Sequence, residues 1–183
     1  MLTGEPFIPE TITVHLGKPD SEAENITVSF PEYVKNVASS EIYPTWPENA
    51  LRANIYVIVS YVLNRIYTEW YRSRGYYFDV TNSTQYDQAF VYGREIFENI
   101  SDLVDELFTY YIRREDAVEP MFAAFCDGIS VSCAGLSQWG TVELANEGKT
   151  PYEILKYYYG DNIVLEKAKD IRTATPTYPG AVL

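Results

Sequence analysis

Apolar and polar residues alternate near the start of the chain. Residues 10–16 contain the run Thr-Ile-Thr-Val-His-Leu, and residues 25–30 read Asn-Ile-Thr-Val-Ser-Phe. Alternation of this kind is typical of a strand with one buried face. The turn signal Gly-Lys-Pro-Asp at residues 17–20 lies between the two runs. We therefore expect two strands that pair as a hairpin or through a longer loop.

Helical periodicity replaces this alternation from residue 30 onward. Ser29 and Glu32 have the spacing of a capping box, with a proline between them, and predict a helix that runs to about Glu41. Pro44 follows and prevents its continuation.

The longest helix is expected directly afterwards. Thr45 and Glu48 repeat the capping-box spacing, and apolar residues recur every three or four positions up to about Arg74, before Gly75. Further apolar residues lie on its other faces. We expect this helix to be central and packed on several sides.

The rest of the chain predicts shorter elements. A polar, turn-rich loop covers residues 78–88, and a helix is expected over 91–114, broken near 99–101. The later expectations are a short buried strand at 120–126, a helix at 136–147 closed by Gly148, and a helix from a third capping box at Thr150 and Glu153 to Tyr159.

The pattern predicts an α+β fold: a helix-rich single domain with a small N-terminal β region and a long central helix. We place this domain at residues 1–166. From Lys167 the pattern fades into Thr, Pro, Ala and Gly, so residues 167–183 are expected to form a linker.

Composition narrows the classes of function. The 183 residues carry a net charge of -12 and show no basic stripe, which argues against nucleic acid and against an anionic membrane surface as partners. There is no apolar stretch of about 18 residues, so membrane insertion is not expected. The N-terminus lacks the pattern of a signal peptide, so the chain is either cytoplasmic at synthesis or a processed piece. Seventeen tyrosines offer flat faces that suit sugar rings, although most helical tyrosines are half-buried packing residues.

Cysteine and histidine chemistry receives little support. Cys126 and Cys133 are close enough in sequence for a disulfide, which the sequence alone cannot establish. His15 is the only histidine and lies in a predicted strand. A zinc site or a cysteine nucleophile with a histidine base is therefore disfavoured, and neither a metal nor another cofactor is predicted.

Glu41 is the strongest candidate for chemistry. It ends the first predicted helix, and Ile42, Tyr43 and Trp46 follow at once. Apolar neighbours disfavour the charged form of a carboxyl group, so such a glutamic acid can donate a proton and later take one back. The alternative is an ordinary solvated residue at a helix end.

Two later segments could complete a site. Residues 122–128 end an apolar run with Cys126 and Asp127 before a glycine. Asp127 is either a second carboxylate, as in paired-acid glycosidases, or an ordinary turn residue. Ser137 and Gln138 are expected in the first turn of a helix, where free backbone amides can meet a polar ligand.

Two motifs carry a resemblance to a known family. Residues 37–54 contain Ser-Glu-Ile-Tyr-Pro-Thr-Trp-Pro-Glu-Asn-Ala-Leu, and residues 135–140 read Gly-Leu-Ser-Gln-Trp-Gly. In order and spacing they resemble the stage II sporulation protein D (SpoIID/LytB) family over roughly residues 29–165. The family's members are peptidoglycan lytic transglycosylases of spore-forming bacteria.

The resemblance implies an activity and a partner. Glu41 would protonate the oxygen between muramic acid and glucosamine, then deprotonate the muramic hydroxyl that closes an anhydro ring. The partner would be peptidoglycan glycan strands, and the protein would be secreted or associated with the spore or cell wall. By resemblance and position, the residues expected to bind substrate are Ser40, Trp46, Tyr61, Cys126, Asp127, Ser137 and Gln138.

The chain also departs from the family pattern. The middle loop at residues 84–88 lacks the Cys/His metal pair that the family often carries, and Ala124 to Gly128 replace a His-Ser-Ser-Ser-Gly segment. With the Tyr-Pro-Gly at residues 178–180, these departures resemble the SleC branch of spore cortex-lytic enzymes. That branch implies a C-terminal peptidoglycan-binding module after the linker, and an activating protease is a conceivable partner of the full-length protein. The rival hypothesis is a non-catalytic domain of the same fold that binds or scaffolds cell-wall glycan.

Overall fold

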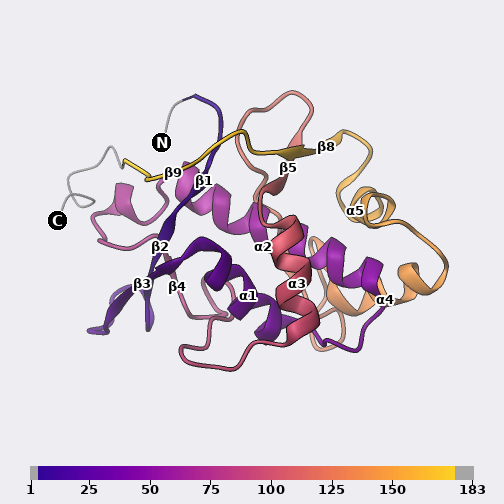
Figure 1. Ribbon diagram of the computed structural model, residues 1–183, viewed down its shortest axis with the longest axis horizontal. Helices are drawn as coiled ribbons and strands as arrows, with labels where there is room; N and C mark the ends of the chain where they lie inside the picture. Colours follow the sequence, from indigo (N-terminus) through magenta and orange to yellow (C-terminus); the bar gives the residue numbers. More distant parts are fainter. Residues whose placement is uncertain (1–3, 176–183) are drawn as a thin grey trace.

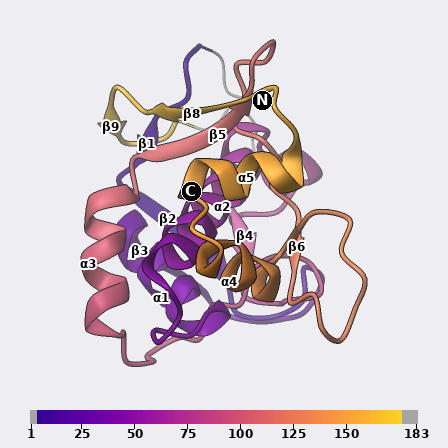
Figure 2. The same ribbon diagram turned by 90° about the vertical axis from the view of Figure 1, so that its right-hand side faces the viewer.

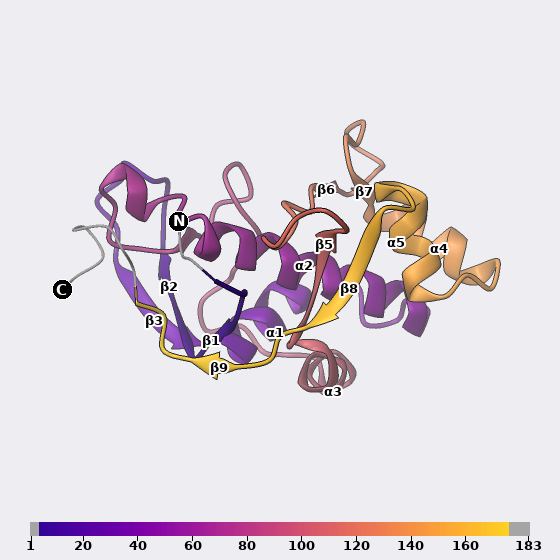
Figure 3. The ribbon, with the colours of Figure 1, turned by 90° about the horizontal axis from the view of Figure 1, so that it is seen from above.

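The central element of the structure is the helix α2 (Glu48–Tyr67), which runs between a sheet at one end and two helices at the other (Figures 1 and 3). Sixteen of its 20 residues are buried. Helices α1 (Phe30–Glu41), α3 (Glu98–Leu107), α4 (Gln138–Asn146) and α5 (Pro151–Tyr159) all contact it. The expectation of a long central helix packed on several sides is confirmed.

The computed structural model describes residues 4–175. These residues form an α+β fold with five α-helices, one short 3-10 helix η1 (Arg72–Arg74) and nine short strands, so the predicted fold class is confirmed. The strands are β1 (Ile8–Pro9), β2 (Thr11–His15), β3 (Asn25–Ser29), β4 (Val80–Thr81), β5 (Tyr110–Arg114), β6 (Phe125–Cys126), β7 (Leu136–Ser137), β8 (Ile163–Lys167) and β9 (Ile171–Arg172).

The strands form four small sheets instead of one large one. The predicted N-terminal pair is confirmed: β2 and β3 are antiparallel, and β4 adds to β2 in parallel. The other sheets pair β1 with β9, β5 with β8 and β6 with β7. Strand β5 packs across α2, where the Ser60 hydroxyl accepts the backbone N–H of Ile112 at 2.7 Å. The sheets thus surround the buried helix and do not form a core of their own.

The first helix follows its sequence signals closely. The Ser29 hydroxyl accepts the backbone N–H of Glu32, and α1 ends at Glu41 as predicted. The capping box predicted at Thr45 is wrong. Pro47 occupies the N-cap of α2 and no side chain caps that end. Pro47 restricts its own φ angle and the conformation of Trp46 before it. The turn is therefore fixed without a hydrogen bond from the Thr45 hydroxyl.

The end of α2 also differs from the prediction. The helix ends at Tyr67, not near Arg74, because Glu69 adopts a left-handed conformation with φ 50°. The Glu69 N–H bonds the carbonyl of Ile66, and the Trp70 N–H bonds that of Arg65 at 3.1 Å. These two bonds form a Schellman motif in which Glu69 takes the place usual for glycine. The chain then makes the turn of η1, which Gly75 closes with φ 90°.

Two other predictions fail in the middle of the chain. The helix expected over 91–114 is confined to α3, and its predicted break lies inside that helix. Residues 110–114 form β5 instead, because Tyr110 to Arg114 pair with β8, a contact between distant segments. The strand expected over 120–126 shrinks to β6.

The C-terminal helices match their predictions. Ser137 caps α4, and Thr150 and Glu153 form a complete capping box on α5, which ends at Gly160. Beyond residue 167 the chain still contacts the domain, since Ile171 and Arg172 pair with Ile8 and Pro9. The expected linker thus begins with residues that are part of the fold. The Tyr-Pro-Gly at 178–180 lies outside the described residues, and the boundary near 166 stays a prediction.

Candidate active site

The carboxylate of Glu41 is held by one donor on each oxygen. Its Oε1 accepts the backbone N–H of Ala89 at 2.8 Å, and its Oε2 accepts the side-chain amide of Gln138 at 2.9 Å. Glu41 is the last residue of α1, so the helix fixes its position, and the two donors fix its orientation. Residues 41, 89 and 138 are far apart in sequence and meet at one point, which is what a prepared site requires.

Gln138 reaches Glu41 because of the way α4 begins. Strand β7 pairs in parallel with β6, and the Ser137 hydroxyl then accepts the backbone N–H of Gly140 at 3.0 Å. Gln138 is thereby the first residue of α4, and its carbonyl accepts the Thr141 hydroxyl at 2.6 Å. The Gln138 side chain is buried and has little freedom to leave Glu41.

Glu41 and Gln138 line a pocket of about 580 Å³, which we call the glutamate pocket. Its walls come from α1, α2, the loop before α3, and the segment around β6. The lining residues are Glu41, Tyr61, Arg65, Thr84, Gln85, Tyr86, Asp87, Phe122, Ala124, Phe125, Cys126, Asp127, Ser130, Val131 and Gln138. The wall combines aromatic faces with polar donors, a composition suited to a sugar.

Four of the seven predicted substrate-binding residues meet in this pocket, and three do not. Tyr61, Cys126, Asp127 and Gln138 line it. Ser40 instead donates from its hydroxyl to the carbonyl of Asn36 at 2.8 Å. Ser137 and Trp46 do not line the pocket either. Ser137 caps α4, and Trp46 is buried against Tyr43 and Trp139, with ring centroids 5.8 and 4.8 Å away.

A buried ion pair forms part of the wall of the glutamate pocket and was missed from the sequence. Arg65 Nε donates to Asp87 Oδ1 at 3.1 Å, and the Asp87 side chain is completely buried. Tyr71 donates to the other Asp87 oxygen at 2.6 Å. Burial raises the pKa values of Tyr61 and Tyr71 above the ordinary range, and the negative charge of Asp87 adds to both shifts. Both phenols are therefore neutral hydrogen-bond donors near neutral pH.

One signal in the sequence could have pointed to this pair. Arg65 follows a mostly apolar run at residues 55–63 of α2, and an arginine buried in such surroundings needs a carboxylate partner. Which carboxylate it finds depends on how the loop at residues 78–88 folds over α2, and no periodic pattern encodes that.

Another wall of the glutamate pocket is a short loop closed by a disulfide between Cys126 and Cys133, whose Cα atoms are 5.6 Å apart. The loop projects from the side of the molecule that carries α4 and α5 (Figure 2). Within it, Asp127 Oδ1 accepts the backbone N–H groups of Ile129 and Ser130 at 2.9 and 3.1 Å. The bond from the Ser130 hydroxyl is the main reason that the pKa of Asp127 is lowered. Of the two alternatives left open for Asp127, these contacts are those of a turn residue.

No metal centre is apparent in the part of the chain from residue 4 to 175, where no three His, Cys, Asp or Glu side chains are grouped to hold an ion. His15 is buried in β2, bonded through Nδ1 to Asn25 and stacked on Phe78 with ring centroids 4.5 Å apart. Both cysteines are in the disulfide. The same described residues contain no helix with the length and apolarity needed to cross a bilayer.

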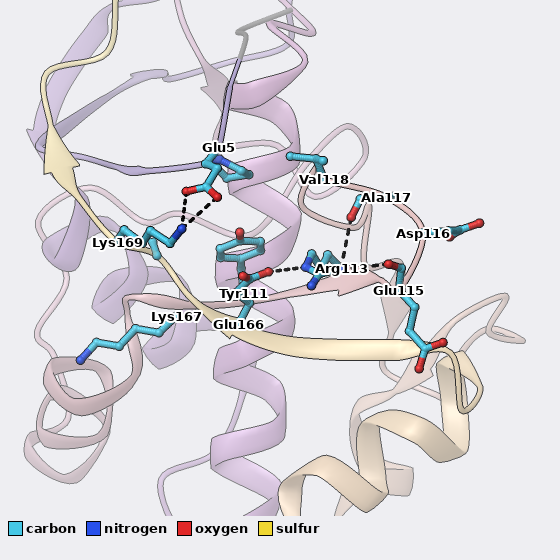
Figure 4. Close-up of a pocket in the computed structure, with 12 residues that line it drawn as sticks. Glu5, Tyr111, Arg113, Glu115, Asp116, Ala117, Val118, Glu166, Lys167 and Lys169 are labelled. Atoms are coloured by element: carbon cyan, nitrogen blue, oxygen red, sulfur yellow. Dashed lines mark hydrogen bonds and ion pairs between the residues drawn. The ribbon is translucent and has the colours of Figure 1, made fainter.

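A second pocket, of about 320 Å³, lies beside strands β5 and β8 (Figure 4). Four of its charged side chains form ion pairs within it: Lys169 pairs with Glu5 at 2.8 Å, and Arg113 pairs with Glu166. None of the residues of the two sequence motifs lines it. The glutamate pocket is therefore the better candidate for chemistry.

Comparison with known families bears on this choice. The family model described as "SpoIID: Stage II sporulation protein" matches residues 20–119, more than half of the chain. The chain belongs to the SpoIID family. The family is linked to lysis of the cell wall in sporulation, and the matched region includes Glu41, Arg65 and Asp87 but ends before Gln138. No curated protein matches the chain significantly. The family match does not separate branches, so placement in the SleC branch stays a prediction.

Proposed function

We propose that this SpoIID-family chain is a lytic transglycosylase that cleaves peptidoglycan between muramic acid and glucosamine, with Glu41 as the acid and then the base. The observation that carries the proposal is the carboxylate of Glu41, which is held by Ala89 and Gln138 at the wall of a sugar-sized, partly aromatic pocket. The partner would be glycan strands of the cell wall or spore cortex, and the protein would act at the wall.

The chemistry needs only one carboxyl group. Protonated Glu41 gives its proton to the bridging oxygen as the bond from that oxygen to the muramic carbon breaks. Glu41, now a carboxylate, then takes the proton of the muramic hydroxyl whose oxygen bonds the same carbon and closes the anhydro ring. Atoms balance without water, and the product keeps the mass of the substrate.

The contacts of Asp127 favour this one-carboxylate scheme over a paired-acid scheme. Three donors from its own turn occupy Asp127, and they stabilise its charged form. A carboxyl group with a lowered pKa is ionised near neutral pH, so it carries no proton to donate, and it is a weak base. A water-activating role would require it to give up these contacts.

The decisive experiment compares the wild type with Glu41→Gln on purified glycan strands. Removing a general acid and base commonly costs about a hundredfold or more in rate. We expect anhydromuramic ends, detected by mass, from the wild type and almost none from Glu41→Gln. Glu98→Gln is a matched control, because it removes an exposed glutamate at the start of α3.

Two results would reject the proposal. One is a folded wild type that yields no anhydromuramic ends, and the other is a Glu41→Gln variant that yields as many as the wild type. Binding of glycan without cleavage would support the rival hypothesis of a wall-binding domain. Products that carry an added water would indicate hydrolysis.

A further inference from the structure

A second hollow continues from the glutamate pocket along α2. It measures about 670 Å³ and shares Arg65, Gln85 and Tyr86 with the glutamate pocket. On its far side it is lined by the turn at Lys18 and by the segment after α2, including Trp70, Arg74 and Tyr76. We call it the basic pocket. Because the two pockets share these residues, they lie next to each other.

Two guanidinium groups flank the ring of Trp70. Arg65 lies 4.5 Å and Arg74 lies 3.6 Å from the ring centroid. The Schellman motif at Glu69 produces this arrangement, because it turns Trp70 back toward Arg65 and starts the turn that carries Arg74. Trp70 is nevertheless 40% exposed. The two cation–π contacts hold this large aromatic side chain in place while part of it stays exposed to a ligand.

The basic pocket carries positive charge on a strongly acidic protein. The chain has a net charge of -12, yet neither Lys18 nor Arg74 has a carboxylate partner among residues 4–175. Arg74 donates only to the carbonyl of Trp70 and the hydroxyl of Ser73, which leaves other N–H groups available. The one acid that lines the pocket, Asp20, accepts the hydroxyl of Tyr76.

Arginine and lysine with free donors favour a carboxylate ligand. Guanidinium groups bind carboxylates through paired N–H bonds, and an ammonium group adds a point charge. Glycan strands of peptidoglycan carry such groups on muramic acid, as the lactyl carboxylate where the peptide is absent and as peptide carboxylates where it is present. The exposed part of the Trp70 side chain also offers apolar contact to a sugar ring.

We propose that the basic pocket is a second binding subsite that holds a carboxylate of the glycan strand whose cleavage Glu41 performs. This inference rests on the proposed function for its choice of ligand. Lys18 and Arg74 supply the charge, and the exposed part of Trp70 supplies an apolar contact. The subsite sets the preference of the protein for strands that keep their muramic carboxylates.

The test measures binding by calorimetry in a Glu41→Gln background, where strands are not consumed. The probes are peptide-free glycan strands, the same strands with their carboxylates reduced to alcohols, and peptide-bearing strands. Replacing both cations, Lys18→Gln with Arg74→Gln, is expected to weaken binding of peptide-free strands about tenfold at low salt. The same variant is expected to bind the reduced strands as tightly as its Glu41→Gln parent does. An effect confined to peptide-bearing strands would assign the carboxylate to the peptide.

A matched control removes one lysine and one arginine elsewhere. This control is Lys167→Gln with Arg172→Gln. In the parent both cations lie over aromatic rings, Arg172 at 4.2 Å from the ring centroid of Phe7, and neither lines the two pockets. This control should bind all strands as the parent does. Thermal melting checks that each variant is folded, as expected for exposed positions.

The outcomes separate the two hypotheses. The subsite is rejected if the Lys18 and Arg74 variant binds every strand like its parent, if reduced strands lose affinity equally, or if no strand binds at all. Failure of the wild type to form anhydromuramic ends would reject the transglycosylase proposal alone, because the calorimetric comparison does not depend on turnover.

Discussion

At the residue scale, Asp87 is an enclosed carboxylate whose contacts are all donors. It accepts Arg65 Nε at 3.1 Å, the Tyr71 hydroxyl at 2.6 Å, and the backbone N–H and hydroxyl of Thr81 at 2.9 and 2.8 Å. A buried charge is tolerated only when its partners replace water in this way. Asp87 thereby ties the loop before α3 to α2 and fixes the wall that the two pockets share.

Replacing this carboxylate should destabilise the fold strongly. Asp87→Asn leaves Arg65 buried without a counter-charge and points an amide at existing donors, so we expect a loss of roughly 3 kcal/mol or more in the free energy of unfolding. Denaturant unfolding measures it. Asp105→Asn is the control, because Asp105 pairs with Lys35 at 2.8 Å on the surface with 59% of its side chain exposed, and should lose about 1 kcal/mol or less. Equal losses in both variants would contradict this account of Asp87.

The residues of the glutamate pocket differ in how far the sequence could predict them. Glu41 and Gln138 could be found because both lie in short local motifs, and the structure joins them through a hydrogen bond. Trp46 and Ser137 lie in the same motifs, but their side chains support local structure instead of lining the pocket. A motif therefore marks the neighbourhood of a site, while the direction of each side chain depends on packing.

At the scale of elements, the disulfide loop between β6 and β7 forms one wall of the glutamate pocket. Cys126 and Cys133 close a loop of only a few residues, and Gly135 approaches the backbone of Ala124 so closely that an added Cβ would lie 2.0 Å from its carbonyl oxygen. Exposed apolar residues Ile129 and Val131 form the outer part of the loop. The crosslink, more than a packed core, therefore holds this wall in place.

Removing the crosslink should loosen the wall and lower stability moderately. For a loop this short, the chain-entropy model gives about 2 to 3 kcal/mol for Cys126→Ser with Cys133→Ser. We also expect a higher KM for glycan strands, because Asp127 and Val131 line the pocket from this loop. Denaturation with and without a reductant provides the control: the wild type should lose stability on reduction, and the variant should not respond. A reduced wild type as stable as the oxidised one would refute the prediction.

Elements with local signals were predictable, and those set by distant pairing were not. The capping box at Thr150 and Glu153 and the glycine at 160 define α5 within one short segment. Residues 110–114, by contrast, continue a helical pattern but form a strand, because β8 pairs with them from about fifty positions later. Strand β9 likewise exists only through its pairing with β1 at the other end of the chain.

At the scale of the whole molecule, buried tyrosines couple stability to alkaline pH. Burial raises the pKa of Tyr111 to about 12, with a further contribution from the charge of Glu166. Burial also raises the pKa values of Tyr33, Tyr61, Tyr71 and Tyr159. An unfolded tyrosine loses its proton near pH 10, whereas the folded protein keeps these protons at higher pH. Their contribution is complete below about pH 10 and is lost as the pH rises toward the folded values.

We therefore expect the free energy of unfolding to fall steeply above about pH 10. Tyr111→Phe tests the cause, because it removes one of these groups from a site whose ring is 3% exposed and keeps its apolar packing. Its stability should match the wild type near neutral pH and decline less steeply in alkali. Free thiols cannot confound the measurement, since both cysteines of the chain are joined. Parallel curves for the two proteins would show that Tyr111 does not contribute to this loss.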